Sequence, residues 1–170
     1  LDVCRCGRRR GTADKRKMTA EPVITDMDSM GARQAAELEK RCFSCPWELE
    51  EYEKSRQRDD FTCLCAYIGG EFAGFLMAFH VLDECHLLDI ATDEKFRRQG
   101  IGAALIRELM KRAGKKDGSV IYLEVREKNQ AARGLYEKLG FVPVGKRKDY
   151  YKYPTDDAVL YTLTLGEEKH

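Results

Sequence analysis

Arg97-Arg98-Gln99-Gly100-Ile101-Gly102 is the stretch of this 170-residue sequence that says most about its fold. It lies between an apolar run, Leu87 to Ala91, and a pattern that predicts a helix from Ile101 to Arg112. The glycines let the backbone approach a ligand closely. The unpaired N–H groups of the first helical turn and the helix dipole favour an anion at that place. The stretch therefore predicts a strand, a turn that binds a phosphate or pyrophosphate, and a helix.

The loop differs from two common nucleotide-binding motifs. A Walker loop ends in Gly-Lys-Ser/Thr, and a dinucleotide fingerprint has three glycines in the pattern G-x-G-x-x-G. Only Gly100 and Gly102 fit here. The pattern R-x-x-G-x-G after a strand resembles the pyrophosphate loop of the GNAT acetyltransferases, which implies binding of acetyl-CoA. A Gly-x-Gly pair at a helix start also arises by chance, so a second signal is needed.

Residues 119–141, SVIYLEVREKNQAARGLYEKLGF, supply that second signal. The run from Val120 to Val125 is β-rich and apolar, which predicts a strand. Asn129 is a suitable cap for a helix from Gln130 to Leu139, and Gly140 suits its end. The stretch L-E-V-R-x-x-N-x-x-A-x-x-L-Y-x-x-L-G-F is similar to the RimI-type ribosomal-protein-alanine N-acetyltransferases, a branch of the GNAT enzymes. The resemblance implies acetylation of the N-terminal alanine of a small-subunit ribosomal protein.

The predicted elements follow the order β-α-α-β-β-β-α-β-α-β-β, which indicates a three-layer α/β domain with a mixed sheet. The predicted strands are 22–25, 61–67, 71–82, 86–92, 120–125, 141–148 and 158–165, and the predicted helices are 29–42, 47–56, 101–112 and 130–139. Pro46 is expected to start the second helix, and residues 149–157 are expected to form a loop. The resemblance, which runs from about Met18 to Leu165, implies the GNAT acyl-CoA N-acyltransferase fold. That fold has a mixed, mostly antiparallel central sheet flanked by helices, with two strands splayed at the CoA site.

Length and charge indicate a single domain with an acidic body. A chain of 170 residues is long enough for one real core. The net charge of +1 is unevenly spread, because residues 1–17 hold seven Lys or Arg and two Asp. The rest of the chain holds 23 basic and 27 acidic residues. A mildly acidic body suits a basic peptide substrate and lacks the basic face of a nucleic-acid-binding domain.

Residues 1–17 show no apolar periodicity and are predicted to be a disordered basic tail, which leaves 18–170 as a single acetyltransferase domain. They lack the apolar core of a signal peptide and the length of a membrane span, so a cytoplasmic protein without membrane contact is expected. The tail has two interpretations. It is either an arm that binds nucleic acid or the ribosome, or upstream sequence before a natural start at Met18, and we favour the second.

The seven cysteines are expected to be reduced thiols. Cys42-x-x-Cys45 has the spacing of half a zinc site or of a redox pair. No second CxxC or pair of histidines accompanies it, and Cys63 and Cys65 share one face of a predicted strand. No metal is therefore expected.

Glu124 and Tyr136 are the candidate catalytic residues, because amine acetylation requires a base for the amine and an acid for the departing CoA thiolate. Glu124 lies in an apolar strand, where partial desolvation is expected to raise its pKa toward that of a base acting through water. A solvated Glu124 paired with Arg126 is the alternative. Tyr136 lies twelve residues later, as the acid does in the RimI-type enzymes, and a phenol of pKa ~10 can protonate a thiolate whose acid has pKa ~8.5. A tyrosine that only packs in the core is the alternative.

The resemblance also implies the cofactor contacts. Backbone N–H groups from Arg98 to Ala103 are expected to hold the pyrophosphate. The side chains of Arg97 and Arg98 are candidates to reach phosphates, and at least one of them is expected to be a solvated charge at the helix start instead. Asn129 resembles an asparagine near the pantetheine arm, although helix capping alone would explain it. A backbone N–H near Ile90 or Ala91 is expected to stabilise the oxyanion. The expected cofactor-binding residues are Ile90, Ala91, Thr92, Arg97, Arg98, Gln99, Gly100, Ile101, Gly102, Ala103 and Asn129.

Aromatic residues in two loops are the candidate walls of a substrate groove. Cys45-Pro46-Trp47 matches a family Phe-Pro-Trp turn beside the peptide groove, with cysteine in place of the aromatic residue. Tyr150 and Tyr151 match paired tyrosines of the final hairpin, although loop packing is an alternative role. Pro46, Trp47, Tyr150 and Tyr151 are thus the expected substrate-binding residues. Asp89 is a departure from the family, in which Asn is frequent at this place, and it is a second candidate carboxylate.

Three functions remain open. The first is acetylation of the N-terminal alanine of the ribosomal protein, and the second is GNAT activity on other protein N-termini, lysines or small amines. The third is a non-catalytic module that binds CoA or the ribosome. Retention of both Glu124 and Tyr136 argues against the third. A monomer is expected that binds acetyl-CoA and the N-terminal peptide of a ribosomal protein without contacting nucleic acid directly.

Overall fold

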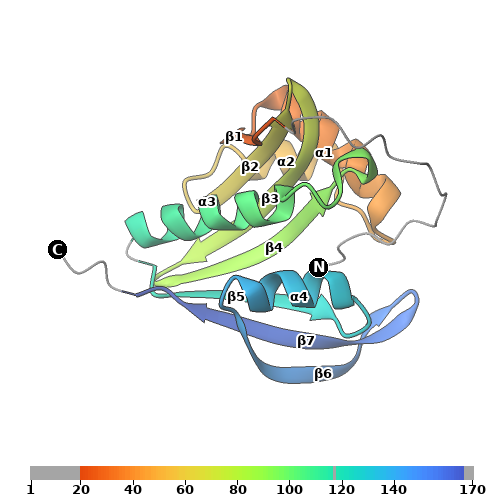
Figure 1. Ribbon diagram of the computed structural model, residues 1–170, viewed down its shortest axis with the longest axis vertical. Coiled ribbons are helices and arrows are strands. Elements are labelled where there is room, and N and C mark those ends of the chain that lie inside the picture. The colour runs from red at the N-terminus through yellow and green to blue at the C-terminus, as the bar shows by residue number, and fades with distance from the viewer. Residues whose placement is uncertain (1–19, 117, 167–170) are drawn as a thin grey trace.

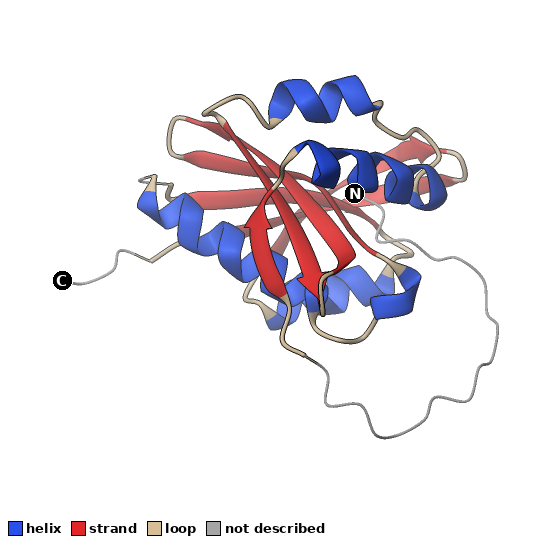
Figure 2. Ribbon diagram, turned by 90° about the horizontal axis from the view of Figure 1, so that it is seen from above, coloured by secondary structure: helices blue, strands red, loops and turns tan. Residues whose placement is uncertain are grey.

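The computed structural model describes residues 20–116 and 118–166, which form one seven-stranded sheet with helices on both faces (Figures 1 and 2). The strands are β1 (Val23–Asp26), β2 (Phe61–Ile68), β3 (Glu71–Val81), β4 (Glu84–Thr92), β5 (Val120–Arg126), β6 (Val142–Lys152) and β7 (Thr155–Thr164). The helices are α1 (Ser29–Cys42), α2 (Leu49–Ser55), α3 (Ile101–Lys115) and α4 (Gln130–Lys138), with a short 3₁₀ helix η1 (Glu94–Phe96). The predicted order of elements is confirmed.

The strands lie in the order β1-β2-β3-β4-β5-β7-β6, and every neighbouring pair is antiparallel except β4 and β5. Two apolar clusters lie on opposite faces. The larger contains Leu105, Leu109 and Tyr136, so α3 and α4 cover that face. The smaller contains Leu38 and Tyr52, so α1 and α2 cover the other. The mixed sheet of the predicted fold is therefore confirmed.

The parallel pair β4–β5 separates after a short common segment. Pairing is restricted to Glu84–Val120, Cys85–Ile121 and His86–Tyr122. Beyond this point β5 continues along β7, while β4 continues along β3 past a bulge at Leu88. Figure 1 shows the two strands diverging toward their C-terminal ends. This is the splay that the family resemblance implied, and it opens the middle of the sheet.

Two predicted boundaries were wrong. The second helix begins at Leu49 and not at Pro46 or Trp47, because Glu48 and Glu51 form a capping box that fixes its start. Residues 149–157 are not a loop, because β6 runs to Lys152 and β7 begins at Thr155. These polar residues belong to an exposed hairpin. Because nearly all residues of β6 are exposed, its sequence lacks the apolar alternation by which a strand is predicted.

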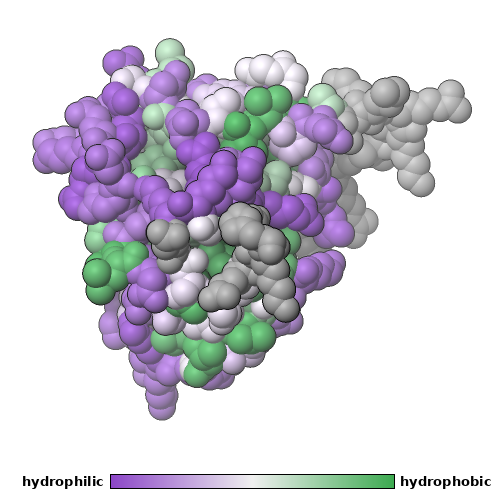
Figure 3. Space-filling model, turned by 90° about the vertical axis from the view of Figure 1, so that its left-hand side faces the viewer, coloured by the Kyte–Doolittle hydropathy of each residue, from purple (hydrophilic) through white to green (hydrophobic). Residues whose placement is uncertain are grey.

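The basic tail and the absence of membrane contact were the other two expectations about the chain as a whole. The predicted tail, residues 1–17, lies outside the described residues. No helix of the described part is long and apolar enough to cross a membrane. The face in Figure 3 is mostly hydrophilic, with its apolar side chains in separate small patches.

Candidate active site

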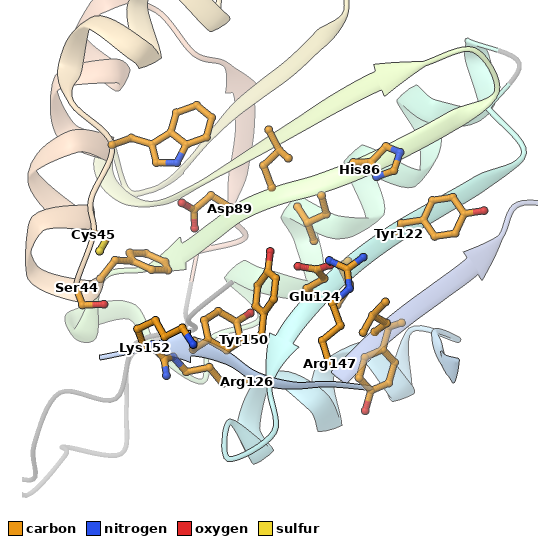
Figure 4. A pocket seen from close by; sticks show the side chains of 18 of the residues that line it. Ser44, Cys45, His86, Asp89, Tyr122, Glu124, Arg126, Arg147, Tyr150 and Lys152 are labelled. Atoms are coloured by element: carbon orange, nitrogen blue, oxygen red, sulfur yellow. The ribbon is translucent and has the colours of Figure 1, made fainter. Parts of the chain in front are cut away.

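A pocket of about 880 Å³ opens where β4 and β5 separate (Figure 4). Its lining comes from the end of α1 and the segment between α1 and α2, from the facing parts of β4 and β5, and from the β6–β7 hairpin. The residues that line it are Glu39, Phe43, Ser44, Cys45, Trp47, His86, Leu87, Leu88, Asp89, Tyr122, Leu123, Glu124, Arg126, Val144, Arg147, Tyr150, Tyr151, Lys152, Tyr153, Leu160 and Tyr161. Glu124, Asp89, Trp47, Tyr150 and Tyr151 all line this one pocket. The predicted acid Tyr136 and the predicted substrate residue Pro46 are not among the lining residues.

The glycine turn lies at the start of α3, outside the lining of this pocket. Gly100 is the N-cap, with φ +79°, and it supplies no side-chain cap. The first helical bond joins the N–H of Ala104 to the carbonyl of Gly100 at 2.9 Å. The amides of Ile101, Gly102 and Ala103 therefore precede the helix's own bonding and are available for a ligand.

The start of α3 packs against α4 on one face of the split sheet. A Cβ built on Gly102 would lie 3.0 Å from Leu135 Cδ2 of α4. Figure 1 shows α3 beginning near the C-terminal end of β4, where β4 and β5 have separated. The exposed Arg98 and the half-buried Arg97 flank this turn. The uncapped helix start and the two cations beside the opened sheet fit a pyrophosphate.

Glu124 extends from β5 into the pocket and is 27% exposed. Its Oε1 lies 2.7 Å from an Nη of Arg147, a residue of β6. A hydrogen bond with Glu124 is also the main cause that raises the pKa of Tyr150. The sequence offered desolvation, or pairing with Arg126, as its surroundings. The structure places it instead in an ion pair with Arg147, which reaches it from the exposed hairpin.

Tyr136 lies on α4 and is completely buried. Its ring packs against Phe141 and Tyr161, with centroids 5.7 and 6.2 Å away. Its hydroxyl has no hydrogen-bond partner among the described residues. Burial, and secondly the charge of Asp89, raise the pKa of Tyr136 well above its usual range. The phenol therefore keeps its proton at neutral pH, as a proton donor requires.

Asn129 and Ile90, two of the expected cofactor-binding residues, each form a hydrogen bond with a neighbour in the chain. The Asn129 side chain accepts a hydrogen bond from the N–H of Ala132 at 3.2 Å, so it caps α4 as predicted. The N–H of Ile90, a candidate oxyanion donor, donates to Asp89 Oδ1 at 3.1 Å. The carboxylate of Asp89 therefore lies directly beside the backbone amide that was expected to stabilise the oxyanion.

A buried carboxyl group on α1, Glu39, is the site residue that sequence reasoning missed. It is 1% exposed and lines the pocket. Its Oε1 accepts the N–H of Trp47 at 3.0 Å, and its Oε2 accepts the hydroxyl of Tyr52. Burial and the nearby charge of Asp89 raise the pKa of Glu39 to about 9. A signal was available, because Glu39 falls on the same buried stripe of α1 as Ala32, Ala35 and Ala36.

Comparison with known proteins places this site in a family. Residues 32–141 match the acetyltransferase (GNAT) family. The chain belongs to the GNAT acetyltransferase family. It is 34% identical over 147 residues to the ribosomal protein bS18-alanine N-acetyltransferase of Escherichia coli strain K12, which covers 84% of this chain and 97% of that one. It is also 34% identical over 159 residues to the N-alpha-acetyltransferase RimI of Mycobacterium tuberculosis, with 88% and 99% covered.

Solved structures agree with this assignment. The crystal structure of the Escherichia coli ribosomal-protein-alanine enzyme has a TM-score of 0.77 and 30% identity, and covers 88% of this GNAT chain and 99% of that one. Arabidopsis thaliana NAA60 in complex with acetyl-CoA shares the fold, with a TM-score of 0.77 at 20% identity and 85% and 99% covered. In the described residues of this acetyltransferase, no group of three or more His, Cys, Asp or Glu is arranged to hold a metal ion.

Proposed function

We propose that this GNAT enzyme transfers the acetyl group of acetyl-CoA to the N-terminal α-amino group of a protein, and that its substrate is the N-terminal alanine of ribosomal protein bS18. The opened β4–β5 pair, with Glu124 in the pocket between the strands, is the observation that carries this proposal. The name of the Escherichia coli relative at 34% identity supports the bS18 substrate, and the name of the Mycobacterium tuberculosis relative supports acetylation of an α-amino group.

Acetyl-CoA supplies the activated acetyl group, and this chain's residues bind it and move the protons. The amides of Ile101 to Ala103 and the side chain of Arg97 would hold the pyrophosphate. Glu124 would accept the proton of the amine through water. Tyr136, buried and protonated, would donate a proton to the sulfur. An amide near Ile90 or Ala91 would face the developing negative charge on oxygen, and the N–H of Ile90 would have to be shared with Asp89, to which it donates.

The shape of the pocket favours a peptide over a small amine. Its volume of about 880 Å³ lies near the upper end of the ~300–1,000 Å³ range of small-molecule sites. Aromatic side chains of two segments line it, namely Phe43 and Trp47 between α1 and α2, and the tyrosines of the β6–β7 hairpin. Such walls suit several successive residues of an extended chain.

A peptide panel tests the proposal. Purified protein and acetyl-CoA are incubated with three peptides: one that begins as mature bS18 does, the same peptide with a blocked N-terminus, and a blocked peptide with an internal lysine. The modified amine is located by tandem mass spectrometry. We expect the first peptide alone to be acetylated, at its α-amino group. Faster modification of the lysine would replace the proposal by lysine acetylation.

A further inference from the structure

Two carboxyl groups from opposite elements meet at the wall of the pocket. Asp89 projects from β4 and is 6% exposed, and Glu39 reaches it from α1. The two side chains share a hydrogen bond. Glu39 is fixed by the Trp47 amide and the Tyr52 hydroxyl, and Asp89 by the Ile90 amide. The pair is therefore held rigidly by donors on both sides.

A single proton must be shared by this pair at neutral pH. Two adjacent buried carboxylates repel one another, so one of them stays protonated. Burial raises the pKa of Glu39 to about 9, which leaves Glu39 neutral and able to donate to Asp89. The negative charge then lies on Asp89, the partner on the strand that edges the split.

A second buried polar group, the hydroxyl of Tyr136, lies near this carboxyl pair. The Tyr136 hydroxyl is completely buried and lacks a hydrogen-bond partner among the described residues. The negative charge of Asp89 contributes to raising the pKa of Tyr136. Buried hydroxyl groups without a partner are rare in proteins, and such a group needs an explanation. In the view of Figure 4, Asp89 and Glu124 lie on either side of Tyr150 within the pocket. Asp89 thus lines the pocket next to Glu39, and the unpartnered Tyr136 hydroxyl lies buried nearby without lining the pocket itself.

We propose that Asp89, held by Glu39, binds the protonated α-amino group of the peptide before that group loses its proton to Glu124. This inference rests on the proposed function and adds the recognition of the reacting group to it. Asp89 is a substrate-binding residue here, and Glu39 is a positioning residue. A carboxylate can accept several hydrogen bonds, so its bond to Ile90 is compatible with binding an ammonium group.

The chemistry of an α-amine explains why such a charge is useful. An α-amino group has an unperturbed pKa of ~7.7–8.0, so most N-termini are cations at neutral pH. A buried single negative charge attracts this cation, whereas Glu124 is already neutralised by Arg147 at 2.7 Å. The attraction holds the amine at the wall until its proton is removed. Asp89 also helps to keep the Tyr136 phenol protonated.

A binding experiment without turnover tests this role. The probes are an alanine-initiated peptide and the same peptide with a propionyl group in place of alanine, which lacks only the α-amino group. Their dissociation constants are measured by calorimetry at pH 7 in the presence of coenzyme A, which carries no acetyl group. We expect the wild-type chain to bind the alanine peptide about 10-fold or more tightly than the propionyl peptide, as befits a charge-assisted hydrogen bond.

Three variants assign that preference to its residue. Glu39→Gln leaves the charge on Asp89, and we expect the preference to persist. The double variant Glu39→Gln with Asp89→Asn removes both carboxyl groups, and we expect the two peptides to bind equally. Glu124→Gln should keep the preference. Thermal melting checks that each variant is folded. If the double variant does not fold, the single variant Asp89→Asn is used in its place, and we expect its preference for the alanine peptide to fall.

The outcomes separate the two proposals. A preference that survives in the double variant, or that disappears in Glu124→Gln, would overturn the role of Asp89 while peptide acetylation stands. A wild-type chain that binds neither peptide would overturn both.

Discussion

Glu124 and Tyr136 have opposite surroundings, and this difference defines the roles that we propose for them. Glu124 is partly exposed and its charge is matched by Arg147. Tyr136 is sealed in the core and its hydroxyl has no partner among the described residues. A carboxylate in contact with solvent suits proton acceptance through water. A phenol that cannot ionise easily suits proton donation.

Removing either group is expected to slow turnover without weakening cofactor binding. Glu124→Gln and Tyr136→Phe should each lower kcat by roughly 10²–10⁴, the usual size of a general acid–base contribution. Glu127→Gln is the matched control for the first, since Glu127 follows the same strand and pairs with Lys146. Tyr161→Phe is the control for the second, since its ring packs against Tyr136. Steady-state kinetics and the Kd of acetyl-CoA provide the measurement.

The pH dependence of these variants gives a further check on the same roles. The pKa of Tyr136 is raised, so its proton is lost only far above neutral pH, and the ratio of wild-type to Tyr136→Phe rates should be constant between about pH 6 and 9. Glu124→Gln should lose less activity at high pH, where more of the amine is already neutral. Near-normal turnover of both variants would show that this pair does not operate here.

Thiol reactivity follows from burial at the residue scale. Burial raises the pKa of Cys63 to about 11 and of Cys65 and Cys85 to about 12, so almost no thiolate is present at pH 8. Cys45 is exposed at the pocket. Iodoacetamide at pH 8 followed by mass spectrometry should label Cys45 in the native protein and should label the three buried thiols only after unfolding. Rapid native labelling of Cys65 would contradict this packing.

At the scale of elements, the start of α3 is the part that should decide cofactor affinity. Gly100 has a positive φ that a β-branched residue adopts only with strain, and Gly102 packs near Leu135. Gly100→Val should therefore weaken acetyl-CoA binding at least about 10-fold, and Gly102→Val should do so by displacing the helix start. Gly114→Ala, on the same helix with open space around it, is the control and should bind normally. Calorimetry with acetyl-CoA, and with ATP as a weak competitor, measures the effect.

The sequence predicted elements well where apolar spacing was strong. The bounds of α1 matched the prediction, and Gly140, with φ +94°, ends α4 as expected. Prediction failed where polar contacts set the boundary. The capping box of Glu48 and Glu51 overrode Pro46 at the start of α2. In the β6–β7 hairpin, exposure removed the apolar alternation on which strand prediction depends.

At the scale of the whole molecule, the site is assembled from contacts that no local pattern contains. The motif on β5 and α4 pointed to Glu124 and Tyr136. The approach of Arg147 from β6, and of Glu39 from α1 to Asp89 on β4, depends on how distant elements pack. Glu39 is the clearest example. Its place on the buried face of α1 could be predicted from the sequence, but its contact with Asp89 could not.

At the scale of the whole molecule we also predict which part of the chain is needed for folding and activity. We propose that residues 18–170 are sufficient, because the described residues between 20 and 166 already contain a complete seven-stranded sheet with an apolar cluster on each face. A chain that begins at Met18 should keep its melting temperature and its kcat/KM on an alanine-initiated peptide. A large loss of either would place the first seventeen residues within the working enzyme.

The most direct test of the account is the acetylation state of bS18 in cells. Intact bS18 is analysed by mass spectrometry from cells that carry the gene for this chain, from cells that lack it, and from cells that carry the Glu124→Gln variant at equal abundance. We expect an acetylated N-terminal alanine in the first cells, an unmodified one in the second and a strongly reduced acetylated fraction in the third. Full acetylation in the absence of the gene would contradict it.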